Sequence, residues 1–349
     1  MDEPLHPSTL SEILDRTVQI YRARFLVFLG IAAVPTAAVL VPICVLVLLG
    51  VSLGARIGVG VQGGFVSGLL VLAAALLVAP VWTAVTALAT AAMNSAASRC
   101  YISSERITIR GAYKEAWPRG WRYIGLYVLE GLLIWAAPVV AWLLLAAGAT
   151  ALMVAMRGAG LNAGALLGLA AFVAGAALIA YALWMFLRLS LAFAACVVEA
   201  TGVTAALKRS AALSKGTRGR IFLLYLLGAV LNYLLMLAVT IPMAIVLALI
   251  PGVSGPQHAQ TMGALVLAAV YGTAFAAQAL TRPVYAIALV LFYYDQRIRQ
   301  EGFDIEWMMQ RAGLVAPAPP QPQAQAATQP QAQPWLPALH PAPEGSDRR

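Results

Sequence analysis

The chain has 349 residues, and 61% of them are hydrophobic even before its 29 glycines are counted, whereas soluble domains are about 45–50% apolar. Only 11% of the residues are charged, and the mean hydropathy is +0.82. So few charges cannot cover the surface of a soluble fold, so composition excludes a water-soluble enzyme and predicts one bundle of membrane helices. The three cysteines are scattered and the three histidines form no cluster, so neither a disulfide framework nor a metal site is expected.

Apolar stretches long enough to cross a bilayer follow one another along the chain. Crossing about 30 Å of hydrocarbon takes about 20 helical residues, and backbone groups in lipid must be satisfied within their own segment. The fold class is therefore predicted to be all-α, a polytopic membrane bundle of six transmembrane helices. The first apolar run is too long for a cleavable signal, so none is expected. The six spans are placed at residues 25–49, 66–93, 124–153, 163–190, 221–249 and 262–292.

Basic residues separate by loop and predict the orientation. Of the 23 lysines and arginines, 19 lie in the N-terminal segment, the loops after the second and fourth spans, and the C-terminal segment. The opposite loops hold only Arg56 and Arg157. The positive-inside rule therefore predicts a multi-pass protein of the cell membrane with both termini in the cytoplasm.

The inner basic segments also predict a partner, the anionic lipids of the inner leaflet. Nucleic-acid binding is not expected, because the positive charge lies against the bilayer and forms no patch interleaved with aromatic residues. The candidate lipid contacts are Lys208, Arg209, Arg218 and Arg220.

A short amphipathic segment precedes each odd-numbered span and suggests an internal repeat. The first begins at a capping box formed by Thr9 and Glu12; the others cover 111–117, ended by Pro118, and 203–213. Three copies of a unit are expected, each an interfacial helix, a basic turn and a helical hairpin. The alternative is that any hairpin bundle with basic inner loops looks periodic. Glycine ladders at 60, 64 and 68 and at 160, 164 and 168 fit close helix packing better than a hinge or a lipid groove.

Three ionisable residues inside the spans, Glu130, Arg188 and Arg282, are the candidate intramembrane polar cluster. Such residues are costly in a membrane and are functional candidates by default. At 1.5 Å per residue they lie about 12, 16 and 20 Å from the inner helix ends, so they can meet. A buried ion pair that fixes helix register, a site for a lipid headgroup or anionic substrate, and snorkelling to the inner surface all remain open. Depth favours Arg188 as the partner of Glu130.

The chain is divided into residues 1–24 with an interfacial helix, the membrane domain over 25–310 and a tail over 311–349. From Val315 the tail holds nine of the 20 prolines and six glutamines, a composition that predicts disorder. Trp335 and Leu336 could anchor a protein partner, although a chance aromatic in a linker fits as well.

Three stretches carry a family resemblance: residues 10–25, residues 198–216, and Phe292–Asp295 with the segment from Arg297 to Asp304. Together they resemble the membrane-domain family of glycerophosphoryl diester phosphodiesterases, bacterial multi-pass proteins that sometimes carry a soluble phosphodiesterase barrel. No such barrel is expected here, because only the tail follows residue 310. The matching positions are Arg188, Glu199, Arg209, Ser210, Tyr294 and Asp295.

The sequence shows no phosphate loop, no zinc-binding histidine pair and no nucleophile elbow, so neither an enzyme nor a cofactor is expected. The leading hypothesis is a non-enzymatic integral membrane protein that organises the cell envelope or holds a protein partner. The alternative is a transporter or lipid flippase that uses the Glu130 and arginine cluster. A membrane enzyme acting on lipids is the reading least supported.

Overall fold

The computed structural model describes residues 7–38, 61–102, 107–158, 164–249 and 259–311, and within these ranges every regular element is helical. The chain divides after Asp304, and α12 (Phe303–Arg311) is the described element at this division. Arg56 and the predicted tail beyond residue 311, with Trp335, lie outside the described residues.

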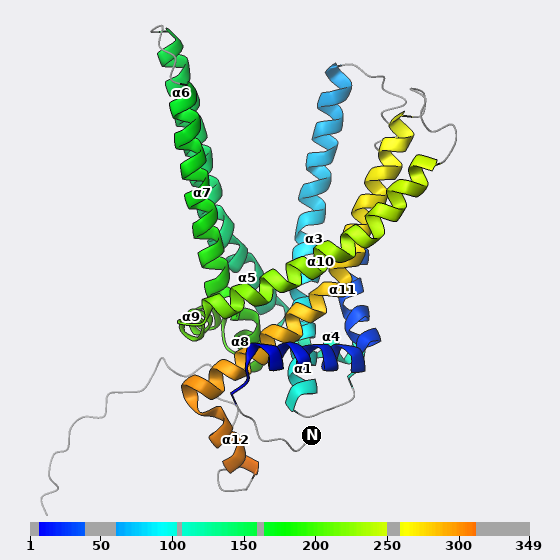
Figure 1. Ribbon diagram of the computed structural model, residues 1–349, viewed down its shortest axis with the longest axis vertical. Coiled ribbons are helices and arrows are strands. Elements are labelled where there is room, and N and C mark those ends of the chain that lie inside the picture. The colour runs from blue at the N-terminus through cyan, green and yellow to red at the C-terminus, as the bar shows by residue number, and fades with distance from the viewer. Residues whose placement is uncertain (1–6, 39–60, 103–106, 159–163, 250–258, 312–349) are drawn as a thin grey trace, which may run out of the picture. The chain divides into compact units, whose positions relative to one another are not determined.

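The described part of the membrane domain consists of helices, several of which follow one another after only short breaks (Figure 1). Its first part holds α1 (Leu10–Ala23), a helix over Phe25–Ala38, α3 (Val61–Ile102), α4 (Ile109–Ala116) and the 3-10 turn η1 (Trp117–Arg119). An almost continuous helical path follows, through α5 (Gly120–Gly131), the π-helical turn η2 (Leu132–Ala136) and α6 (Ala137–Gly158). The last part holds α7 (Gly164–Leu189), α8 (Ala192–Val198), α9 (Val203–Leu213), α10 (Arg218–Leu249) and α11 (Ala259–Glu301).

Four helical paths in the described residues are long and apolar enough to cross a membrane: Ile109–Met156, Leu167–Val198, Arg218–Met243 and Gly272–Glu301. A fifth results if α1 and Phe25–Ala38, which meet at 87°, count as one broken span. The predicted bundle of membrane helices is confirmed in this coarse form. The count of six and the threefold repeat stay predictions, because the first predicted span is described only to Ala38 and the side chains of residues 61–75, at the start of α3, lie outside the description.

Helix α1 forms as its sequence predicts. The Thr9 side chain accepts from the Glu12 backbone N–H, and the Glu12 carboxylate accepts from the Thr9 N–H at 2.7 Å, which completes the capping box. Ile13 and Thr17 are buried, and α1 packs along α11. The Tyr21 hydroxyl donates to the Leu280 carbonyl of α11 at 3.0 Å. This helix therefore lies against the bundle through a narrow apolar face.

The buried core lies where α3, α8 and α11 meet. The contacting faces of α3 and α8 are rich in alanine, including Ala92, Ala96 and Ala195, which lets the helix backbones approach closely. Larger side chains from α11, such as Phe292 and Tyr293, fill the space between them. The antiparallel pair of α6 and α7, in contrast, exposes large apolar side chains along its length, as expected for a surface that faces lipid.

Candidate functional site

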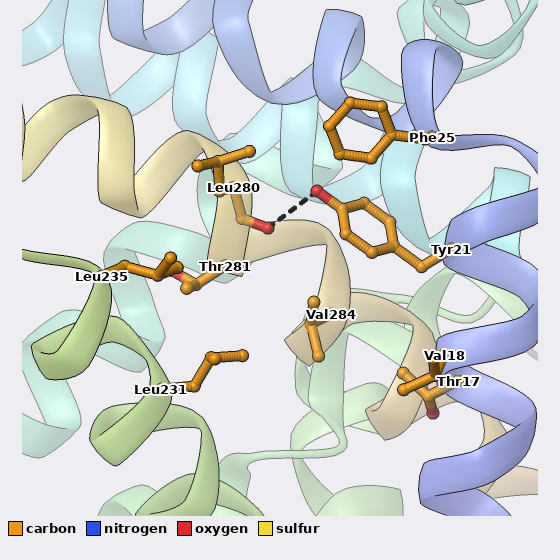
Figure 2. Close-up of a pocket in the computed structure, with 9 residues that line it drawn as sticks. All are labelled: Thr17, Val18, Tyr21, Phe25, Leu231, Leu235, Leu280, Thr281 and Val284. Carbon is orange, nitrogen blue, oxygen red and sulfur yellow. Dashed lines mark hydrogen bonds between the residues drawn. The ribbon is translucent and has the colours of Figure 1, made fainter. Parts of the chain in front are cut away.

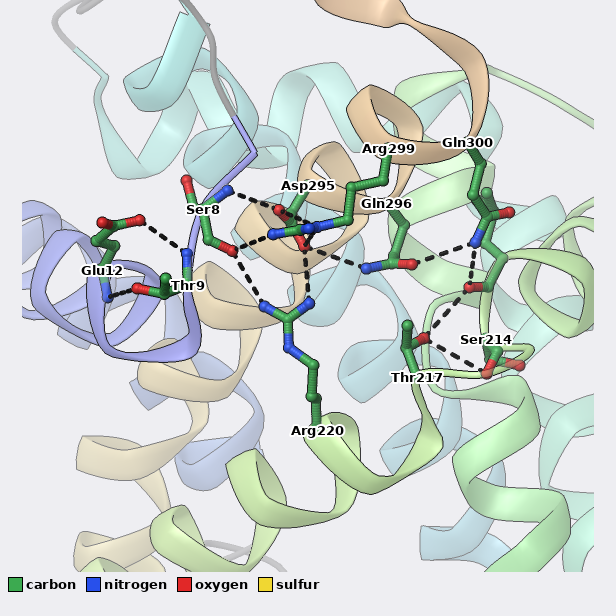
Figure 3. A network of polar contacts seen from close by, with 11 residues as sticks. Ser8, Thr9, Glu12, Ser214, Thr217, Arg220, Asp295, Gln296, Arg299 and Gln300 are labelled. Carbon is green, nitrogen blue, oxygen red and sulfur yellow. Dashed lines mark hydrogen bonds and ion pairs between the residues drawn. The ribbon is translucent and has the colours of Figure 1, made fainter.

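A buried carboxylate, Asp295, lies near the C-terminal end of α11 and is only 2% exposed. The Arg299 Nε lies 3.0 Å from both of its oxygens, and the Arg220 Nη1 lies 3.3 Å from Oδ2. The Ser8 backbone N–H donates to Oδ1 at 2.8 Å, and the Gln296 amide donates to Oδ2 at 3.1 Å. Figure 3 shows these donors converging on the one side chain. Its buried charge is therefore compensated by two cations and two neutral donors.

The same arginines also hold the segment that precedes α1. The Ser8 carbonyl accepts from the Arg299 Nη2 at 2.8 Å and from the Arg220 Nη2 at 3.1 Å. Ser8 and Asp295 are 287 positions apart in sequence, so this contact joins the two ends of the membrane domain. We call the region formed by residues 7–9, α9, the first turn of α10 and the last two turns of α11 the basic end.

A second group of charges at the basic end centres on Arg209 of α9. Its Nε donates to Glu199 at 2.8 Å and its Nη2 donates to Glu301 at 2.6 Å. Arg297 is 3.3 Å from Glu301, and the Tyr293 hydroxyl donates to Glu199. Burial opposes the charge of Arg209, but the hydrogen bonds that it donates to Glu301 and Glu199 outweigh this effect and raise the pKa of the guanidinium. The acids and arginines of this group therefore stabilise one another.

The break between α7 and α8 is closed by serines of α9 and its C-cap. Helix ends leave backbone groups without intrahelical partners, and these must be satisfied elsewhere when they are buried. The Ser210 hydroxyl donates to the Arg188 carbonyl at 2.9 Å and accepts from the Leu191 N–H at 3.1 Å. The Ser214 hydroxyl also reaches the Arg188 carbonyl, at 3.3 Å. These contacts fix where the Arg188 side chain leaves the helix.

The predicted pairing of Glu130 with Arg188 does not form. Among the described residues Glu130 makes neither a hydrogen bond nor an ion pair. The guanidinium of Arg188 lies over the Trp184 ring, with Cζ 5.2 Å from its centroid, and Arg282 donates to the Gln278 side chain at 3.3 Å. The estimated depth of about 16 Å for Arg188 counts the residues back from Glu199 along one helix, whereas α7 ends at Leu189.

Glu130 and Arg282 nevertheless share a neighbour. Tyr127, one helical turn before Glu130 on α5, lies within electrostatic range of both side chains. Glu130 also lies one residue before the end of α5, where the π-helical turn η2 begins. Such turns change the direction in which side chains leave a helix and are frequent at functional sites. The intramembrane cluster of Glu130, Arg188 and Arg282 therefore stays a candidate.

The four predicted lipid contacts have different environments. Arg209 and Arg220 are engaged in the ion pairs of the basic end, while Lys208 is exposed on α9. Arg218 lies over Trp184, with Cζ 5.4 Å from the ring centroid. Lipid contact by these residues stays a prediction.

A pocket of about 280 Å³ lies between α1, α10 and α11 (Figure 2). Its polar groups already have partners, since Tyr21 donates to Leu280 and the Thr281 hydroxyl donates to the Ala277 carbonyl at 2.9 Å. Its walls are otherwise aliphatic or aromatic, including Phe25, Leu231 and Leu235. This pocket suits hydrocarbon rather than a polar substrate.

Sequence reasoning singled out Asp295 only through the family resemblance, and it singled out neither Arg299 nor Trp184. The pair Asp295 and Arg299 has the i, i+4 spacing of helical ion pairs, which is a signal that could have found it. Nothing comparable links Trp184 to Arg218, which meet only in the folded chain. Within the described ranges, no three potential metal ligands gather. Comparisons of the chain with protein-family models, curated proteins and solved structures find no match.

Proposed function

We propose that this is a non-enzymatic integral membrane protein of the bacterial cell membrane that organises the envelope or holds a partner protein. The supporting observation is that the acids of the basic end are engaged in ion pairs. Asp295, Glu199 and Glu301 are each bound by arginines that come from other segments of the fold. Carboxylates that are held by arginines in this way stabilise the fold rather than donate or accept protons in a reaction.

The position of the residues that carry the family resemblance supports this proposal. Residues that carry it, among them Glu199, Arg209, Ser210 and Asp295, all lie at or next to the basic end. These contacts would hold the basic end in one shape.

The basic end is proposed to face the cytoplasm. After the native cysteines are replaced by alanine, single cysteines at Arg110 and Arg157 are labelled in intact cells with a reagent that does not cross the membrane. Arg157→Cys should react at once, and Arg110→Cys only after permeabilisation. The reverse pattern would overturn the orientation.

A partner is proposed to bind through the tail beyond residue 315, which includes Trp335. A photo-crosslinking amino acid is placed at Trp335 in the full chain, expressed in its native membrane. We expect one crosslinked protein, absent from a chain that carries the same group at the exposed Lys208. Failure to crosslink, or hydrolysis of glycerophosphodiesters by the purified protein alone, would refute the scaffold.

A transporter or lipid flippase is the second candidate, and Glu130 is the observation that favours it. A carboxylate without an ion pair among the described residues, in a membrane-spanning path, can carry a proton or bind a cationic group. Substrate flux or lipid scrambling in proteoliposomes should then be lost in Glu130→Ala. The matched control is Glu115→Ala, because Glu115 forms a half-exposed ion pair with Arg99 on the surface. No flux in the wild type would refute this candidate.

A further inference from the structure

Two arginines at the ends of neighbouring helices share one aromatic ring. Arg188 is in the last turn of α7, and Arg218 is the first residue of α10. Their Cζ atoms lie 5.2 and 5.4 Å from the centroid of the Trp184 ring. Both guanidinium groups therefore lie against the same ring, at the ends of two neighbouring helices.

Neither arginine has an acidic partner among the described residues. The side chains of Arg188 and Arg218 make no hydrogen bond or ion pair there, and the Nε of Arg218 is a buried donor without an acceptor. This differs from the arginines nearby: Arg209 and Arg220 each hold a carboxylate. A buried donor that lacks an acceptor costs free energy, and two cations side by side repel each other. A bound anion would remove both costs.

The surroundings indicate which anion fits. A third positive contribution comes from the start of α10, whose first turn contains no acidic residue and whose Gly219 leaves open space beside the backbone. Guanidinium forks match the oxygens of a phosphate group. Trp184 adds an interfacial aromatic, as is usual at the headgroup level.

The same helices also expose apolar side chains next to the arginines. Leu183 on α7 and Phe222, Leu223 and Leu226 on α10 are each at least 41% exposed. Phe222 is one helical turn beyond Arg218, so the apolar surface begins where the cationic groups end. A phospholipid would therefore place its phosphate at the arginines and its hydrocarbon chains against these apolar side chains.

We propose that Arg188 and Arg218, arranged around Trp184, form a binding site for a phosphate group, supplied by an anionic phospholipid headgroup or by free phosphate. Ser210 and Ser214 act as positioning residues, because they hold the Arg188 carbonyl and so fix the last turn of α7. The site needs the chain to be in a membrane but does not depend on the scaffold role.

Native mass spectrometry of the full-length protein tests the site. The protein is purified in detergent and mixed with equal amounts of dioleoyl phosphatidylglycerol and dioleoyl phosphatidylcholine. Wild type should retain the anionic lipid in preference. Loss of one guanidinium fork should weaken this retention about tenfold, in Arg188→Gln and in Arg218→Gln alike. Arg110→Gln, which removes an exposed arginine from α4, is the matched control and should bind as wild type does.

A second measurement distinguishes the two sources of phosphate. Inorganic phosphate and phosphatidylglycerol are each titrated against wild type and both variants, with the melting temperature as the readout. Stabilisation by inorganic phosphate that requires both arginines identifies a free phosphate site; stabilisation by phosphatidylglycerol alone identifies a lipid site.

Trp184 reports on the site in the native fold. Quenching of tryptophan fluorescence by brominated phosphatidylglycerol should fall in Trp184→Phe. Circular dichroism checks that each variant keeps its helices. The proposal is overturned if both arginine variants keep wild-type lipid preference, or if folded variants and wild type respond equally to both ligands.

Discussion

Replacing Asp295 by asparagine keeps the shape of the side chain and removes its charge. One oxygen remains to accept from the Ser8 N–H, now held at 2.8 Å. The other becomes an amide group whose hydrogens point at Arg299, Arg220 and Gln296, all of them donors. The substitution therefore turns three favourable contacts into contacts between donors.

The size of the effect follows from burial. Removing one partner of a fully buried ion pair costs about 3–5 kcal/mol, because the remaining charge is left without compensation. Here the acid side chain is 1% exposed, but Arg220 and Arg299 are 30% and 39% exposed and can turn toward water. We therefore expect Asp295→Asn to lower the free energy of unfolding by about 2–3 kcal/mol.

The assay is unfolding of the purified protein in mixed micelles, followed by circular dichroism. Asp15→Asn, which neutralises an exposed acid on α1, is the control and should change stability by less than about 0.5 kcal/mol. Combining Asp295→Asn with Arg220→Gln should cost less than the sum of the single changes, because the two side chains interact. If Asp295→Asn is as stable as the control, the network does not hold the basic end together.

Two further substitutions test the packing around the site. Ser210→Ala leaves the Leu191 N–H without its buried acceptor and should destabilise the fold by about 1–3 kcal/mol in the same assay, whereas Ser210→Thr should retain most of the stability. Gly228→Ala places a methyl group 2.4 Å from the Tyr285 ring and should cost about 1–3 kcal/mol; unchanged melting would show that α10 and α11 are further apart. Tyr285→Leu in the same chain should relieve that loss.

Much of the fold could be predicted from local patterns. The capping box at Thr9 depends on residues three positions apart, and the long apolar stretches depend on composition alone, so neither needs tertiary information. The end of α7 at Leu189 lies one residue from the predicted end of the fourth span, but the contacts that stabilise this end could not be predicted in this way. The break that follows interrupts an apolar run and is stabilised by Ser210, a residue 19 positions beyond Leu191 that only the fold brings to it.

In the candidate site, too, the sequence predicts local features but not the contacts between distant segments. Charge counting identified the basic residues but not which of them face inward. Arg209 and Arg220 are indistinguishable from Arg218 in the sequence, yet the first two meet carboxylates of other segments and Arg218 meets an aromatic ring. The difference is set by the direction in which each side chain leaves its helix, and a linear pattern does not contain that direction.

Glu130→Gln distinguishes a structural role of the intramembrane acid from a role in transport. Since Glu130 has no ion pair in the described structure, the neutral amide should leave the free energy of unfolding unchanged within about 0.5 kcal/mol, or raise it by removing a poorly solvated carboxyl group. A structural pair with Arg188 or Arg282 would instead cost about 3–5 kcal/mol, and Arg188→Gln or Arg282→Gln would restore part of it. Unfolding in mixed micelles measures both outcomes. A loss above about 2 kcal/mol that either arginine substitution relieves would show that Glu130 is paired after all, and would favour a structural acid over a transport site.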